Sequence, residues 1–124
     1  MSRILSENTK PEIFIRKLLF KNGYRYRLND KKLPGKPDIV FKSKKKVIFV
    51  HGCFWHRHKN CKYCTTPKTN ISFWQNKFLK NIERDKLAYH NLKKIGWSYF
   101  IVWECKTKNK NSDLIKELKT FLCN

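Results

Sequence analysis

Acidic side chains are scarce in this sequence: its 124 residues include 9 Asp and Glu but 29 Lys and Arg, a formal net charge of +20. Such an excess disfavours a compact state through self-repulsion, and it is usually tolerated because the partner is a polyanion. We expect that polyanion to be nucleic acid. The alternative is a basic surface that only keeps the protein in solution.

Long apolar runs are missing as well. No stretch of the chain approaches the roughly 18 apolar residues that a membrane span requires, and residues 1–5 hold no apolar run of signal-peptide length. These absences argue against a transmembrane or a secreted protein. We expect a cytoplasmic protein whose thiols stay reduced.

Enough apolar material is nevertheless present to form a core. Hydrophobic residues make up 40% of the chain and aromatic residues 15%, too much for a disordered basic tail. Periodicity and capping signals predict helices over residues 10–22, 72–94 and 113–122, and strands over 24–28, 38–41, 47–51 and 98–103. Residues 52–67 form an irregular loop. This order predicts a single α/β domain over residues 1–124, with a mixed central sheet flanked by helices.

The irregular loop concentrates possible metal ligands. The chain has five cysteines, and clustered Cys and His in a reduced protein more often bind metal than form disulfides. Cys53, His58 and Cys61 could supply three ligands to a tetrahedral zinc. The fourth is either Cys105, after the last strand, or Cys64, which forms a Cys-x-x-Cys pair with Cys61. A closed set of four would be structural; the alternative is a group of inert, buried cysteines.

One carboxylate falls on the apolar side of the long predicted helix. Apolar residues recur at helical spacing at positions 78, 82, 89 and 92, and Asp85 fills the gap between them. An ionised carboxylate on this inward face is costly without a partner. We expect a His or an Arg as that partner, in a catalytic pair or in a structural ion pair.

A second carboxylate, Asp38, opens a predicted strand. That strand should pair with the one that ends at His51, which places both residues on one sheet. His56 lies nearby in the loop, so acidic and imidazole groups converge on one neighbourhood. In the alternative interpretation, each His is a satisfied polar residue of the core. Glu12 could act only as the return half of a capping box at the start of the first helix.

Basic and aromatic residues also share the middle of the chain. Lysines at 42 and 44–46 fill the presumed turn between two strands, and two aromatic pairs follow, Phe54-Trp55 and Phe73-Trp74. Lys neutralises phosphates, whereas aromatic rings stack on bases or wedge between them. We therefore expect a nucleic-acid surface in this part of the chain. The alternative places the rings in the core.

Five stretches of the sequence carry a resemblance to a known family. They are residues 33–41 (LPGKPDIVF), 47–56 (VIFVHGCFWH), 73–74 (FW), 81–85 (NIERD) and 96–105 (GWSYFIVWEC). On these residues the chain resembles the very short patch repair (Vsr-type) endonucleases, bacterial enzymes that nick DNA beside a T:G mismatch. The resemblance implies a restriction-endonuclease-like (PD-(D/E)xK-type) fold with a zinc-bound loop.

The same resemblance implies roles for the candidate residues. Asp38 would be the principal Mg²⁺ ligand, joined by the backbone carbonyl of Val50. His56 would be the general base, oriented by Asp85. Two further residues complete the catalytic set, with a phosphate contact for His51 and a water-mediated contact to the Mg²⁺ for Glu12. The structural Zn²⁺ set would be Cys53, His58, Cys61 and Cys105, with Cys64 as the alternative ligand, and the rings that intercalate would be Phe54, Trp55 and Trp74.

The resemblance also implies a partner and a location. T:G mismatches arise when 5-methylcytosine deaminates, so a cytosine-5 DNA methyltransferase is the expected functional associate. The enzyme would act as a monomer on double-stranded DNA, at the nucleoid of a bacterial cytoplasm. Restriction nucleases usually carry an acidic-x-Lys pair where this chain has Phe49-Val50-His51, which favours the repair subgroup. The competing hypotheses are a related nuclease without mismatch preference and a non-catalytic, zinc-bearing module that binds nucleic acid.

Overall fold

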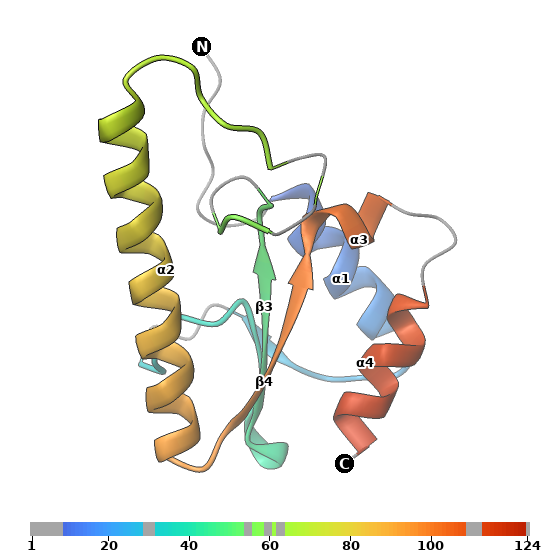
Figure 1. Cartoon of the computed structure of the whole chain (residues 1–124). Coiled ribbons are helices and arrows are strands. Elements are labelled where there is room, and N and C mark those ends of the chain that lie inside the picture. The colour runs from blue at the N-terminus through green and yellow to red at the C-terminus, as the bar shows by residue number, and fades with distance from the viewer. Residues whose placement is uncertain are drawn as a thin grey trace.

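Four strands form one mixed sheet through the middle of the molecule (Figure 1). They are β1 (Arg27–Leu28), β2 (Ile39–Phe41), β3 (Lys46–His51) and β4 (Ser98–Trp103), in this spatial order. The pairs β1–β2 and β2–β3 are antiparallel, whereas β3 and β4 are parallel. The computed structural model describes residues 9–28, 32–53, 56–58, 61, 64–108 and 113–123. The predicted mixed α/β architecture is confirmed.

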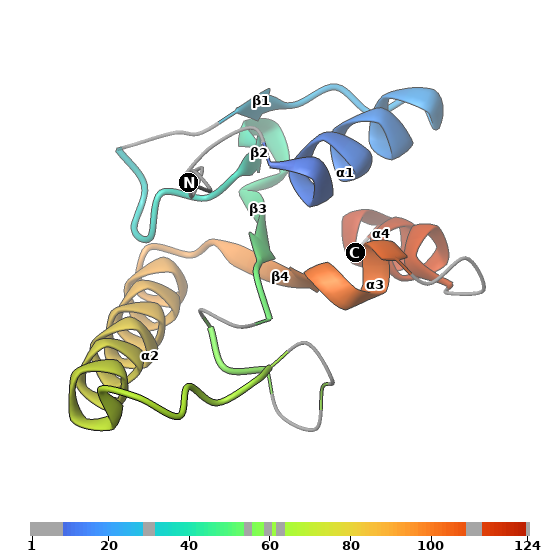
Figure 2. The ribbon, with the colours of Figure 1, turned by 90° about the horizontal axis from the view of Figure 1, so that it is seen from above.

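Helices cover both faces of this sheet, as Figure 2 shows from above. One face carries α1 (Lys10–Lys21) and α4 (Leu114–Cys123), and the other carries α2 (Ile71–Lys94). A short helix, α3 (Glu104–Lys108), follows β4, and a 3₁₀ turn, η1 (Lys42–Lys44), joins β2 to β3. The three predicted helices agree with α1, α2 and α4 to within one residue at each end. Within the described part of the chain, no helix is long and apolar enough to cross a bilayer.

The strands bury apolar side chains on both faces because successive residues point to opposite sides of a sheet. Toward α1 and α4, the core cluster includes Ile39 and Ile48. Toward α2, it includes Val40, Val47 and Phe49. Apolar side chains therefore fill both faces of the sheet. Polar functional side chains are found instead at the end of the sheet where β3 and β4 finish.

One expectation about strand ends needs correction. The strand predicted over residues 24–28 contains only Arg27–Leu28, because the rings of Tyr24 and Tyr26 pack edge-on against Phe41 at 6.3 Å instead of extending the ladder. β4 ends at Trp103 as expected, and Cys105, which follows it, lies in the first turn of α3. The expected zinc ligand thus lies where β4 passes into α3.

The lysine-rich turn lies far from the end of β3. From Lys46 to His51 the strand advances about 17 Å, at roughly 3.3 Å per residue. Lys46 itself is only 6% exposed, and its Nζ donates to the carbonyl oxygen of Phe121 in α4 at 2.6 Å. The prediction that Lys46 belongs to an exposed, nucleic-acid-binding turn is therefore wrong, because burial of its stem and this hydrogen bond hold it against α4.

Candidate active site and metal centre

A cleft of about 670 Å³ opens at the end of the sheet where β3 finishes. It lies among residues from the start of α1, the segment before β2, the end of β3 and the middle of α2. Its lining brings together acids, imidazoles and exposed cations: Glu12, Asp38, Asp85, Glu104, His51, His56, Lys36 and Arg84. Every catalytic residue expected from the sequence therefore lies in one cleft.

Two carboxyl groups meet on one side of this cleft. Asp38 lies just before β2, and its Oδ2 accepts a hydrogen bond from the backbone N–H of Val50 at 2.7 Å. Glu12 is only 4% exposed, and its Oε2 accepts from Nη2 of Arg16 at 3.3 Å. Burial raises the pKa of Asp38 to about 7, and the charge and hydrogen bond of Glu12 add to this, while the Val50 N–H and Arg16 act in the opposite direction.

This environment is suited to a divalent cation. Buried carboxyls that disfavour one another's ionisation are stabilised when a positive ion shares their oxygens. Mg²⁺ prefers carboxylate, carbonyl and water oxygens over nitrogen or sulfur. The donor set formed by Asp38, Glu12 and the nearby Val50 backbone therefore fits Mg²⁺. Glu12 also lies in the first turn of α1, where its N–H donates to Thr9 Oγ1 at 3.5 Å, so it takes part in the N-terminal cap as well as in the cleft.

Two histidine rings stack in the same cleft. The rings of His51 and His56 lie 3.7 Å apart at an angle of 18°. His56 Nδ1 lies 2.6 Å from Asp85 Oδ2, which confirms that the inward carboxylate of α2 has a His partner. Burial lowers the pKa of His51 to about 3, helped by the neighbouring His56 and opposed by Asp85. His51 is therefore neutral at physiological pH.

One side chain that contacts the site is not identified by the sequence pattern. The hydroxyl of Tyr89 lies 2.6 Å from His51 Nε2, although the sequence pattern assigned position 89 only to the apolar stripe of α2. The signal that could have found it is spacing, because residues four apart on a helix lie side by side. Tyr89 therefore follows Asp85 on the same face, one turn further along α2.

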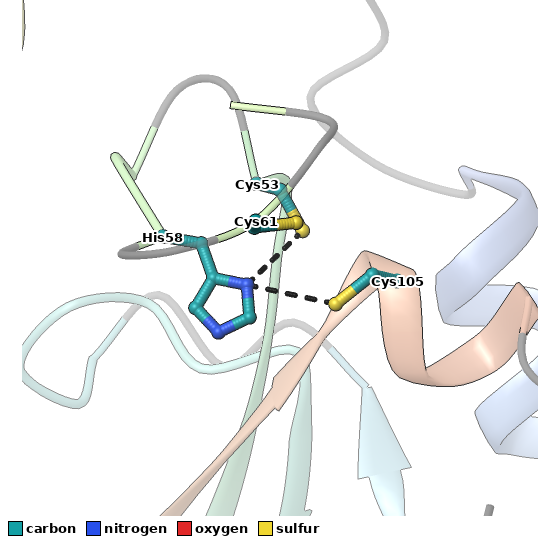
Figure 3. Close-up of side chains that lie close together, drawn as sticks. All are labelled: Cys53, His58, Cys61 and Cys105. Atoms are coloured by element: carbon teal, nitrogen blue, oxygen red, sulfur yellow. Dashed lines mark hydrogen bonds between the residues drawn. The ribbon is translucent and has the colours of Figure 1, made fainter. Parts of the chain in front are cut away.

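A second cluster of ligand atoms, from residues that do not line the cleft, is drawn in Figure 3. The ligand atoms of Cys53, His58, Cys61 and Cys105 all lie within 4.8 Å of one another. Nδ1 of His58 is 3.6 Å from the sulfur of Cys53 and 3.5 Å from that of Cys105. Ligands of a tetrahedral zinc with Zn–S distances of about 2.3 Å are about 3.8 Å apart, so the four atoms fit such an ion. Cys64 is not part of this group.

The parallel register of β3 and β4 explains how the distant cysteine joins the loop. His51 pairs with Trp103 at the ends of the two strands. Cys53 and Cys105 each follow two residues later, so they leave the sheet side by side. His58 is held by a stacking contact with Trp103, at 4.2 Å and 7°. A metal at this cluster would therefore link the loop to the ends of both strands.

The expected intercalating rings are only partly described. Phe54 and Trp55 lie outside the residues that the structure describes. Trp74, near the start of α2, is half-buried, and its ring stacks on Phe78 at 5.8 Å. Its neighbour Phe73 is 58% exposed. The intercalating role of these rings stays a prediction.

Comparisons with known proteins point to one family. Residues 1–63 match the family model described as DNA mismatch endonuclease Vsr. The chain is 47% identical over 125 residues to the type II nicking enzyme V.NmeAIP of Neisseria meningitidis serogroup A, covering 96% of this chain and 89% of the relative. It is 45% identical to the type II nicking enzyme V.XorIIP of Xanthomonas oryzae pv. oryzae, over 86% of this chain and 77% of the relative. It is 37% identical to the DNA mismatch endonuclease Vsr of Escherichia coli K12, over 99% and 81%.

Proposed function

Because this chain belongs to the Vsr family of DNA endonucleases, we propose that it nicks the T-containing strand of double-stranded DNA at T:G mismatches. The reaction is a Mg²⁺-dependent hydrolysis of a phosphodiester bond in very short patch repair. The family implies a restriction-endonuclease-like fold, with which the mixed sheet and its flanking helices agree. The observation that carries the proposal is the meeting of the Asp38–Glu12 carboxyls and the His56–Asp85 pair in one cleft.

The carboxylate side of the cleft is the cation site in this proposal. Asp38, the carbonyl of Val50 and, through water, Glu12 would hold Mg²⁺. When bound, Mg²⁺ neutralises charge that develops on the phosphate and polarises water. The hydrogen bond from the Val50 N–H fixes the Asp38 carboxylate, and Arg16 holds Glu12, so both acids are oriented before substrate arrives. The cations of Lys36 and Arg84 at the same cleft favour the approach of a phosphate.

The imidazole side supplies proton transfer. Asp85 accepts a hydrogen bond from His56 Nδ1, which fixes the tautomer and leaves Nε2 to take a proton from water. After that transfer the imidazolium is stabilised by the adjacent carboxylate. His51, neutral and buried, contacts a phosphate oxygen as a hydrogen-bond donor. The two stacked rings therefore have different tasks, one as base and one as phosphate ligand.

In this proposal the aromatic residues select the mismatch. Phe54, Trp55 and Trp74 would wedge into the base stack, and the structural Zn²⁺ held by Cys53, His58, Cys61 and Cys105 would support the loop that carries the first two rings. Unstacking costs a few kcal/mol per step and least at a mispaired step, so the wedge itself discriminates. T:G pairs arise by deamination of 5-methylcytosine, which makes a cytosine-5 DNA methyltransferase the functional associate. Recognition of an asymmetric mismatch suits a monomer.

The test of this function compares two labelled duplexes that differ only in one base, T:G against T:A. We expect Mg²⁺-dependent nicking of the T strand at T:G, and cleavage of T:A slower by about 100-fold, as a wedge that costs a few kcal/mol more in paired DNA predicts. EDTA should abolish both reactions. Equal cutting of the two duplexes would favour a related nuclease without mismatch preference. Tight binding without any cutting would favour a non-catalytic binding module.

The His56–Asp85 pair makes a second prediction. His56→Ala should lower the nicking rate by roughly 10²- to 10⁴-fold, the usual effect of a general base. Asp85→Asn should lower it less, and the double variant should be no slower than His56→Ala, because Asp85 acts only through His56. Single-turnover nicking rates measure this. The matched control is Glu83→Gln, at an exposed position of α2, which should keep the wild-type rate; multiplicative losses in the double variant would contradict the pairing.

A further inference from the structure

Helix α2 presents two side chains, one turn apart, to the two stacked histidines. Asp85 contacts His56 at 2.6 Å, and Tyr89 contacts His51 at 2.6 Å. The His51–His56 stack is therefore held from the same helix face at both rings. The proposed function assigns a role to Asp85 but uses neither Tyr89 nor its hydroxyl.

The ring of Tyr89 is itself fixed in place. It stacks on Tyr99 of β4 at 4.4 Å and 12°, and its edge meets Phe49 of β3 at 5.6 Å. An apolar side chain could fill this position in the core equally well. The feature that packing does not require is the hydroxyl, which ends at His51 Nε2.

The chemistry of imidazole gives that hydroxyl a task. A neutral imidazole has one N–H donor and one acceptor nitrogen, and phosphodiester oxygens only accept hydrogen bonds. Since Nε2 of His51 is engaged by Tyr89, the nitrogen left for a phosphate is Nδ1. It can donate only if Nδ1 carries the proton, which requires Nε2 to accept from the tyrosine hydroxyl.

We propose that Tyr89 is a positioning residue that donates its hydroxyl proton to His51 Nε2, and so selects the tautomer in which His51 Nδ1–H faces the substrate phosphate. This inference rests on the proposed phosphate contact of His51. Tyr89 does not touch the substrate. It acts on the reaction through the orientation and tautomer of one imidazole, as Asp85 does through the other.

The direct test is nitrogen NMR on ¹⁵N-histidine-labelled protein as purified, without added Mg²⁺. The chain has four histidines, and His51→Gln identifies the His51 signals by their loss. In the wild type we expect a protonated Nδ1 and an unprotonated Nε2 in His51. Tyr89→Phe should shift the proton toward Nε2, whereas Tyr99→Phe, which keeps the stacked ring, should not. A wild-type signal of the Nε2–H form, or an unchanged signal in Tyr89→Phe, would overturn the proposal.

Nicking kinetics give the second readout. Tyr89→Phe should lower the single-turnover rate at saturating enzyme by roughly tenfold, the effect of one hydrogen bond, with little change in DNA affinity. The single-turnover rate of Tyr99→Phe should stay within about twofold of the wild-type rate, because this variant keeps the hydrogen bond to His51. Equal rates for the two variants would reject a positioning role. If the wild-type chain fails to nick T:G DNA, the proposed function fails, and the NMR comparison still decides whether Tyr89 sets the tautomer of His51.

Discussion

We expect Asp38→Asn to lower the rate of nicking of T:G DNA by at least about 1000-fold. This is the scale of the effect when a ligand is removed from a metal that stabilises charge in the reaction. The amide of Asn can still accept the hydrogen bond that Val50 N–H gives to Asp38 at 2.7 Å. The variant therefore keeps the local geometry and loses only the negative oxygen. Single-turnover nicking rates measure the loss, and fluorescence anisotropy on the same duplex should show binding close to that of the wild type.

The same substitution should change how stability depends on pH. Burial raises the pKa of Asp38 from 3.8 to about 7, so the folded protein without Mg²⁺ holds this proton more tightly than the unfolded chain does. The stability from this group is fully present below pH 4 and is lost as pH rises through 7, by on the order of 4 kcal/mol. Urea unfolding in EDTA should therefore show that the free energy of unfolding of Asp38→Asn rises relative to that of the wild type between pH 4 and 7.

Two outcomes would contradict this account of Asp38. One is wild-type nicking by Asp38→Asn, which would remove Asp38 from the active site. The other is a free-energy difference between variant and wild type that stays constant from pH 4 to 7. Glu83→Gln, on the exposed face of α2, is the control that neutralises an acid outside the cleft, and it should reproduce the wild-type profile.

Loss of Cys105 should be the most damaging change outside the cleft. In the proposed zinc site, this residue is the ligand that comes from α3 rather than from the loop. Cys105→Ser should lower the zinc content and the midpoint of thermal unfolding by about 10 °C or more, because metal binding contributes directly to folding free energy. Nicking should fall with it, because the proposed base His56 lies between the ligands Cys53 and His58.

Elemental analysis and thermal unfolding of matched cysteine variants check this prediction. We expect about one zinc per chain in the wild type and in Cys64→Ser. The exposed Cys123 offers a second control, and Cys123→Ser should match the wild type in both measurements. Zinc retained by Cys105→Ser but lost by Cys64→Ser would show that Cys64, and not Cys105, is the fourth ligand. A wild-type protein that contains no zinc would contradict the proposed metal centre.

Local patterns predicted the helices well because their signals lie within the helices. The apolar repeat of α2 located the helix to within one residue and showed Asp85 as a carboxylate on the inward face, and the structure supplies the expected His partner. The choice between Cys64 and Cys105 could not be made in this way. It depends on the parallel register of β3 and β4, a contact between segments about fifty residues apart that no spacing within the loop encodes.

Residues with both a packing role and a polar contact were the hardest to predict. Tyr89 fits the apolar stripe, and only its position opposite His51 gives the hydroxyl a partner. Lys46 lies in a run of lysines that is typical of an exposed turn, yet the carbonyl of Phe121 at the end of α4 draws it into the interior. In both cases the partner comes from a distant element, so the role of the side chain is decided by tertiary structure.

The turn between β2 and β3 offers a place to attach a label. Residues 42–45 lie at the opposite end of β3 from His51, about a full strand length away. A fluorophore, an affinity tag or a surface tether attached there would lie about a strand length from the proposed catalytic cleft. The exposed side chain of Lys44 is therefore a suitable attachment point for single-molecule observation of nicking.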